Sequence, residues 1–242
     1  MQETSALYKS ITSGAYETEI TVEIANTRYG MDKLVSLTTS RTTLGDGTPK
    51  LGNAVGGELD VTLYGDSKDV PRAAVIRVYV RAVSKTTGDK SEWLPKGVYF
   101  VDTREQIADT LQIHGYDAIL KAELPYPDSI LDWPATDIDV VREIASTIDC
   151  EIDSRTVSLM TQQFPIQVPE QYVSDGDDDM SKVFTMRETL SGIAGLYGGV
   201  FISNDFGKLQ LICPWSKPVE TYLLLDEIGN YLTVGGDRIL LR

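Results

Sequence analysis

The sequence contains few of the residues on which most recognisable active sites depend. It has one histidine, His114, and two cysteines, Cys150 and Cys213. The spacings of a serine-hydrolase elbow, a zinc-protease helix, a phosphate loop and a dinucleotide fingerprint do not occur in it. His114 alternates with Ile113 in a strand-like stretch that has no nucleophile motif nearby. We therefore expect a structural or surface histidine, no catalytic residue and no enzymatic activity.

The two cysteines form neither a disulfide framework nor a metal-ligand spacing. Both lie next to apolar segments, so we interpret Cys150 and Cys213 as plain buried thiols. Because no disulfide framework is indicated, the cytoplasm is the expected place of synthesis.

Long apolar runs and positive charge are also lacking. No run approaches the roughly 18 residues of a membrane-spanning helix, and the N-terminus has no basic segment followed by an apolar one, so we expect no signal peptide and no membrane anchor. The net charge of −14 argues against specific binding to nucleic acid or to an anionic membrane. It leaves a basic partner protein possible.

Clustered carboxylates are the most conspicuous local charge. The cluster comprises Asp175, Asp177, Asp178 and Asp179 in SDGDDDMS. Such oxygens can hold a hard cation, but the alternate spacing, the glycine and the final glutamate of a calcium loop are missing. We favour an exposed, self-repelling loop and expect neither a metal nor a cofactor site.

The first half of the chain has the patterning of an antiparallel β-barrel or sandwich. The alternating apolar positions are Ile20, Val22 and Ile24, then Leu59, Val61 and Leu63, then Val75, Val78 and Val80. About six strands with turn signals at short spacing and no helical segment are expected here. We assign a polar N-terminal arm to 1–15 and a β-barrel domain to 16–122.

After Leu120 the sequence pattern changes to one that predicts helices together with strands. Three prolines in KAELPYPDSILDWP indicate a boundary. A helix is predicted over 136–148, with Thr136 as its N-cap and apolar residues spaced along one face. CEID is expected to follow as a short strand, so that 123–207 forms an α/β domain with two helix–strand units.

The second of these units is the best specified. Thr185 and Glu188 have the spacing of a capping box, and Gly198 with Gly199 is expected to end the helix. VFIS and KLQLI then form two strands joined by the turn NDFG. The remaining residues, 208–242, are expected to begin a second β-barrel, and the final RILLR suggests that this last domain is incomplete.

These features together resemble the hub proteins of phage and prophage tails, which are central baseplate or tail-tip proteins related to the N-terminal region of tail-associated lysins. The resemblance covers roughly residues 15–215. It is carried by GELDVTLYG, PKGVYFVDTREQ and LQIHGYDAIL, by WPATDIDVVREIASTIDCEID, and by TMRETLSGIAGLYGGVFISNDFGKLQLI.

The resemblance implies an α+β chain with a β-barrel, a small α/β domain and the start of a second barrel. It implies a homotrimeric ring that connects the tail tube to the tip, with distal tail, tail-tube and tape-measure proteins as partners. The expected location is the tail of a virion or phage-like particle assembled in the bacterial cytoplasm.

Two other functions remain open. One is a carbohydrate- or receptor-binding β module at a tail tip, which would need an exposed groove lined by aromatic residues. The other is a glycoside hydrolase that uses paired carboxylates, for which no sequence motif is required. Trp93, Trp133 and Trp215 are possible sugar platforms, but each lies close to a proline, where we expect it to fill a domain junction.

Overall fold

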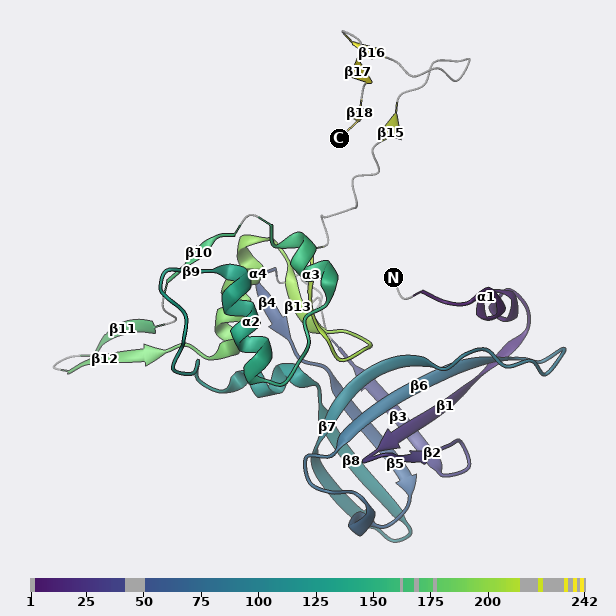
Figure 1. Cartoon of the computed structure of the whole chain (residues 1–242). Helices are drawn as coiled ribbons and strands as arrows, with labels where there is room; N and C mark the ends of the chain where they lie inside the picture. The colour runs from purple at the N-terminus through teal and green to yellow at the C-terminus, as the bar shows by residue number, and fades with distance from the viewer. Residues whose placement is uncertain are drawn as a thin grey trace. The chain divides into compact units, whose positions relative to one another are not determined.

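The computed structural model in Figure 1 describes most of the chain. The described residues are 3–41, 51–161, 163–167, 170–175, 178–213 and the short strands 222–223, 233–234, 237–238 and 240–241. Only the backbone is described within 170–175, within 178–183 and in the short strands after residue 213. The chain divides into two compact units, Met1–Ile212 and Cys213–Arg242.

A seven-stranded antiparallel sheet dominates the first unit. Its strands, in spatial order, are β2 (Thr27–Tyr29), β1 (Tyr16–Ile24), β6 (Val75–Ser84), β7 (Leu94–Ile107), β8 (Thr110–Tyr116), β5 (Glu58–Tyr64) and β3 (Leu34–Ser40). Together with the helices, this sheet confirms the mixed α+β class expected from the sequence. Among the described residues β2 and β3 do not pair with each other, so closure of the sheet into a barrel stays a prediction.

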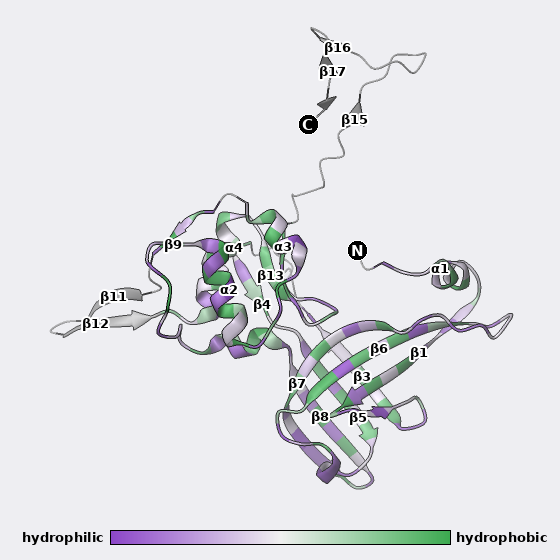
Figure 2. Cartoon of the chain, in the orientation of Figure 1, coloured by the Kyte–Doolittle hydropathy of each residue, from purple (hydrophilic) through white to green (hydrophobic). Residues whose placement is uncertain are grey.

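Alternation of apolar and polar residues builds this sheet (Figure 2). In β5, Leu59, Val61 and Leu63 are buried, whereas Glu58 and Tyr64 are exposed. Because successive strand residues point to opposite faces, one face can enter the core while the other meets solvent. The predicted inward residues of β5 are therefore confirmed.

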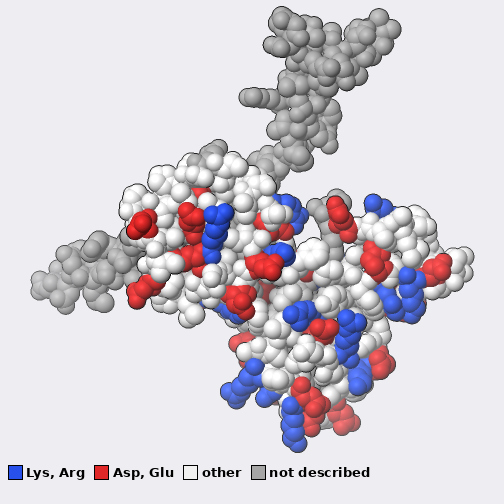
Figure 3. Space-filling view, in the orientation of Figure 1, with Lys and Arg blue, Asp and Glu red and all other residues white. Residues whose placement is uncertain are grey.

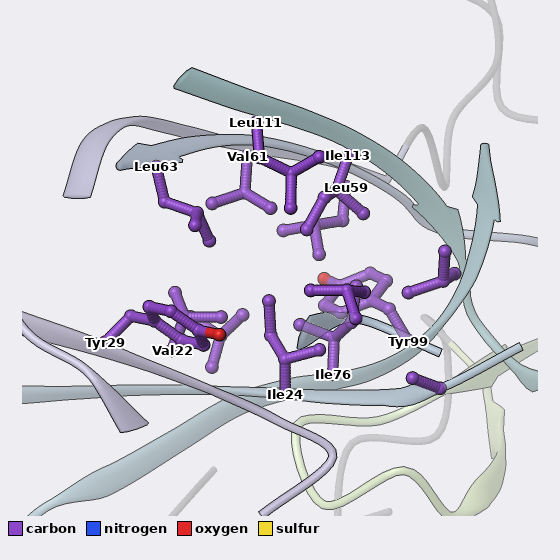
Figure 4. Close-up of a cluster of buried hydrophobic side chains, with 14 residues drawn as sticks. Val22, Ile24, Tyr29, Leu59, Val61, Leu63, Ile76, Tyr99, Leu111 and Ile113 are labelled. Carbon is purple, nitrogen blue, oxygen red and sulfur yellow. The ribbon is translucent and has the colours of Figure 1, made fainter. Parts of the chain in front are cut away.

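The core lies between two halves of the curved sheet. Figure 4 shows residues of β5 and β8 pointing toward residues of β1, β2, β6 and β7. The facing side chains are Leu59, Val61, Leu63, Leu111 and Ile113 on one side and Val22, Ile24, Tyr29, Ile76 and Tyr99 on the other. Each fully buried aliphatic side chain contributes about 1.5–3 kcal/mol relative to exposure.

A smaller three-stranded sheet lies beside three of the helices of the unit (Figure 1). Its order is β14 (Leu209–Ile212), β13 (Val200–Ser203) and β4 (Asn53–Val55), and its helices are α2 (Asp137–Thr147), α3 (Ser154–Leu159) and α4 (Met186–Leu196). β13 pairs with β14 antiparallel and with β4 parallel. The parallel strand β4 comes from the first half of the chain.

Two of these pairings cross the domain limits expected from the sequence. β4 lies within 16–122 but pairs with β13, and β14 lies within 208–242 but belongs to the first compact unit. The expected division into 1–15, 16–122, 123–207 and 208–242 itself stays a prediction.

The capping signals of α4 are confirmed. The Thr185 hydroxyl accepts a hydrogen bond from the backbone N–H of Glu188, and the Glu188 carboxylate accepts one from the N–H of Thr185. The helix ends at Leu196, and Gly198 has a φ of 60°, which glycine adopts at little cost. Ile193 and Ala194 are buried, as expected.

Helix α2 also begins as predicted, with Thr136 as its N-cap. The segment after it differs from the prediction, because CEID does not form a strand. Only one isolated bridge joins Ile152 to Leu209, and α3 begins at Ser154. Asp153 caps α3 by accepting the N–H of Arg155, and a helix six residues long leaves too short an apolar period to be recognised.

The N-terminal arm contains a helix that the sequence analysis did not predict, α1 (Ala6–Thr12). Ser5 caps it by accepting the N–H of Tyr8. The hydroxyl and N–H of Ser5 also donate to the carboxylate of Glu92 at 2.6 and 2.7 Å. These bonds attach the beginning of the chain to the segment before β7.

The other elements are short. They are the 3₁₀ helices η1 (Ser67–Asp69) and η2 (Ala118–Glu123) and the strand pairs β9 (Ala135–Thr136) with β10 (Pro165–Ile166) and β11 (Glu170–Asp175) with β12 (Asp178–Val183). The second unit contains β15 (Tyr222–Leu223) paired with β18 (Leu240–Leu241), and β16 (Thr233–Val234) paired with β17 (Asp237–Arg238). Among the described residues, none of the helices has the length and apolarity needed to cross a bilayer.

Candidate functional site

The candidate site is the free edge of β3, an end strand of the large sheet. Among the described residues, β3 pairs with a strand on one side only, and that strand is β5. Its sequence, LVSLTTS, contains neither a charged residue nor a proline, and Thr38 in its middle is exposed. An edge strand presents unpaired backbone N–H and C=O groups, and charged residues or prolines ordinarily discourage another chain from pairing there. β3 carries one deterrent, a bulge between Leu34 and Ser36, which leaves the rest of the strand regular.

The opposite end of the sheet is better protected against pairing with another chain. β2 has only three residues, and its Arg28 forms an ion pair with Glu23 at 3.1 Å. β1 pairs with β2 only from Val22 onward, so its stretch 16–21 has one strand neighbour among the described residues. That stretch contains Glu17 and Glu19, and charge on an edge opposes pairing with a further strand.

Side chains cover the β4 edge of the small sheet. The backbone N–H of Ala54 donates to the Ser191 hydroxyl at 3.1 Å, and its carbonyl accepts from Arg187 Nε at 2.7 Å. Both partners come from α4. The edge of β4 is thus satisfied within the molecule.

The β14 edge of the small sheet is covered as well. Leu209 exchanges backbone hydrogen bonds with Glu151 and Asp153 at 2.8 and 2.9 Å. The N–H of Leu211 donates to the Thr156 hydroxyl at 2.9 Å. Within the described part of the chain, β3 is therefore the longest edge that lacks both partners and charges.

A hollow of about 570 Å³ beside β1 contains Trp93, one of the possible sugar platforms. The Arg81 guanidinium lies 4.3 Å from the centroid of the Trp93 ring, so one face of the indole is occupied. Hydrogen bonds from Lys90 and Arg81 lower the pKa of Glu19. The positive charges of Lys90 and Arg81 therefore balance the negative charge of Glu19 within the hollow.

The other two tryptophans lie elsewhere or outside the described residues. The Trp133 ring packs edge-on to Tyr126, with ring centroids 6.1 Å apart. Trp215 falls outside the described residues. The structure therefore does not bring Trp93 and Trp133 into one described hollow.

His114 lies on the large sheet opposite Asp60. Its Nδ1 is 2.7 Å from Asp60 Oδ1, and its ring packs edge-on to Tyr116 at 4.6 Å. The two residues face each other across β8 and β5. These contacts link neighbouring strands, and neither cysteine is among the partners of His114.

Cys150 and Cys213 are half-buried thiols. Burial raises the pKa of Cys150 to about 11, and its thiol donates to the Gly207 carbonyl at 3.1 Å. Burial also raises the pKa of Cys213. Because the thiolate is the reactive form of cysteine, both thiols are poor nucleophiles near neutral pH.

The acidic cluster in SDGDDDMS lies outside the described side chains. Asp177 is not described, and only the backbones of Asp175, Asp178 and Asp179 are. The described residues elsewhere contain no group of three or more His, Cys, Asp or Glu placed to hold a metal ion.

Asp117 is a structurally important carboxylate that the sequence analysis missed. It lies at the junction between β8 and η2 and is almost completely buried. Its oxygens accept from the N–H of Gly57 at 2.7 Å and of Ile119 at 3.0 Å. Burial raises the pKa of Asp117 to about 6. The only local signal in the sequence for this role is the position of Asp117, directly after a strand and before a short helix.

Asp153 is a second missed carboxylate. It accepts from Arg155 Nε and from Asn204 Nδ2, each at 2.7 Å. The Arg155 guanidinium holds the pKa of Asp153 at about 2. Asn204 in turn accepts the N–H groups of Phe206 and Lys208. The network fixes the β13–β14 turn against α3.

Surface charge does not single out another site on the visible face. Figure 3 shows basic and acidic side chains interspersed over the large sheet. No protein-family model matches the chain, and no curated protein matches its sequence.

Proposed function

We propose that this protein is a structural component of the tail tip or baseplate hub of a phage or phage-like particle, in which three copies form a ring that connects the tail tube to the tip. The observation that carries the proposal is the free β3 edge. A ring needs a surface that pairs with a neighbouring copy, and closed symmetry covers such edges in every copy.

The small sheet supports the same function. Its edges are covered by α4, by α3 and by the segment before α3, and α4 is capped at its start by Thr185 and Glu188. A scaffold needs defined geometry, and this part supplies it through backbone and packing contacts. Closure of the large sheet into a barrel, with a second barrel begun by 208–242, belongs to the same proposal.

The proposed partners are further copies of the chain, distal tail or tail-tube proteins and the tape-measure protein, in the tail of the particle. The carbohydrate- or receptor-binding alternative depends on the hollow that contains Trp93. It predicts saturable binding of sugars to the isolated protein and loss of that binding in Trp93→Ala.

The experiment compares two threonine-to-lysine variants by sedimentation velocity. Thr38 is exposed on β3 and lies opposite Asp60, so Thr38→Lys gains a cross-strand charge partner and should fold normally. It should shift the assembly toward monomer, because lysine on an edge opposes strand pairing. Thr103→Lys, at an exposed position in β7, should assemble like the wild type. Equal assembly of Thr38→Lys and wild type would exclude β3 as the contact.

A further inference from the structure

Arg41, the residue that follows β3, carries a buried hydrogen-bond donor with no acceptor. Its side-chain Nε is shielded from solvent and makes no hydrogen bond with the described part of the chain. No described carboxylate forms an ion pair with Arg41 either. A buried donor without an acceptor is costly, and more so when it is charged. The guanidinium is therefore available to an anionic acceptor.

Asp117 and Asp205 lie near Arg41, and each has other partners. A Cβ built on Gly57 would lie 3.3 Å from Arg41 Nε and 2.9 Å from Asp117 Oδ2, but the Asp117 carboxylate accepts two backbone N–H groups. Asp205 Oδ2 is 3.5 Å from Lys96 Nζ. Because Lys96 balances the charge of Asp205, the charge of Arg41 can balance that of a bound anion.

Arg41 lines a hollow of about 360 Å³ that β3, β6 and β7 bound. Sites for small molecules range from roughly 300 to 1,000 Å³ and combine an apolar lining with a few polar groups. Figure 4 shows Tyr99 among the side chains that point into the core of the large sheet. The apolar lining of the hollow consists of Leu37, Val78, Val80 and Tyr99, and Thr39 and Ser40 line it beside Arg41.

The charges and the apolar lining together favour a monocarboxylate. A planar guanidinium binds a carboxylate through two parallel N–H···O bonds. A doubly charged phosphate would bring a second negative charge toward Asp205, which lines the same hollow. Val78 and Tyr99 are buried in this lining, and apolar surface of this kind gains from contact with an apolar group.

We propose that Arg41 binds the carboxylate of a small molecule whose apolar part occupies this hollow. Among the described residues β3 pairs with neither β6 nor β7, so the bound molecule would bridge β3 to the middle of the large sheet. The inference goes beyond the proposed function, because no part of it depends on contacts between copies.

Isothermal titration calorimetry of the full chain with 4-phenylbutyrate tests the site, with the neutral 4-phenylbutyramide as the matched ligand. The acid should bind saturably, and the amide at least about ten-fold more weakly. Methyl resonances of Leu37 and Val78 should shift on binding. Those of Ile212, which lines a neighbouring hollow that also contains Arg41, should stay in place. Equal binding of acid and amide, no saturable binding, or shifts confined to Ile212 would overturn the inference.

Substitution of Arg41 gives an independent measurement. Arg41→Met keeps an apolar stem and removes a donor that lacks an acceptor, so the variant should fold. It should bind 4-phenylbutyrate at least about ten-fold more weakly. Arg72→Met, at an exposed arginine outside the hollow, should bind like the wild type. If Arg41→Met also binds like the wild type, the inference fails and the proposed function stands.

A carboxylate at the end of a peptide has the same chemistry as a free acid. An acetylated tripeptide that ends in phenylalanine distinguishes the two sources in the same titration. It should bind more weakly than 4-phenylbutyrate, because the hollow has room for a small molecule only. Tighter binding of the tripeptide would overturn the assignment to a small molecule.

Discussion

The backbones of Gly52 and Gly195 approach each other so closely that a Cβ built on Gly52 would lie 3.1 Å from the Cα of Gly195. This contact brings the chain that enters β4 against α4. The N–H of Gly52 donates to the Gly199 carbonyl at 2.8 Å, immediately before β13 begins. The small sheet thus depends on a close approach between residues far apart in the sequence.

We predict that Gly52→Ala is destabilising. Gly52 has a φ of 72°, in the left-handed region where alanine is strained, and the new methyl group would also be crowded by α4. The free energy of unfolding should fall by about 1–3 kcal/mol in urea titrations. Gly195→Ala is the control, because a Cβ there would lie 3.7 Å from the Cα of Gly52, an ordinary contact. Alanine in a helix should be neutral or stabilise by about 1 kcal/mol. Equal effects of the two variants would contradict this account.

Asp117 should make stability depend on pH in an unusual direction. Burial raises its pKa in the folded protein to about 6 from 3.8, so the folded state binds the proton more tightly than the unfolded state does. This contribution is fully present below about pH 4 and is lost as the pH rises through about 6, a total of about 3 kcal/mol.

Asp117→Asn isolates this effect. The variant carries no titrating group at this position and loses one backbone hydrogen bond, which is a nearly constant offset. The difference in unfolding free energy between wild type and Asp117→Asn should therefore shrink from pH 4 to pH 7.5. A difference that stays constant with pH would show that Asp117 titrates normally.

Asp153 should act in the opposite direction. Its pKa is held at about 2 by Arg155, so it stabilises the folded state above about pH 4 and loses this contribution as the pH falls toward 2. At pH 7, Asp153→Asn should lower the free energy of unfolding by about 2 kcal/mol, and the loss should diminish between pH 4 and pH 3.

The matched control for Asp153 is Glu151→Gln. Glu151 also forms an ion pair, with Lys208 at 2.6 Å, but its side chain is 78% exposed. Solvent screens an exposed pair, which contributes little to stability, so Glu151→Gln should change the free energy of unfolding little at any pH. A larger loss in Glu151→Gln than in Asp153→Asn would refute the assignment of the stabilising network to Asp153.

Local signals in the sequence predict much of the fold and little of its assembly. The capping box of Thr185 and Glu188, the glycine at 198 and the alternation of β5 all depend on neighbouring residues, and each is confirmed. The pairing of β4 with β13 joins segments separated by more than half of the chain. The glycine-rich stretch before β4 predicts a turn, and no local pattern indicates a parallel partner.

The edge position of β3 is equally difficult to predict from the sequence. The sequence LVSLTTS predicts a strand, but whether that strand lies at an edge depends on the order of all seven strands. Likewise, Asp117 and Asp153 gain their shifted pKa values from burial and from residues brought near by folding. Such effects are properties of the packed chain.

The most direct test of the proposed function is the symmetry of the protein in solution. Sedimentation velocity across a range of concentrations, combined with negative-stain imaging, should show a species with three times the chain mass of 26.7 kDa and a three-fold ring. A monomer at every concentration, with no ring in the images, would contradict the hub proposal.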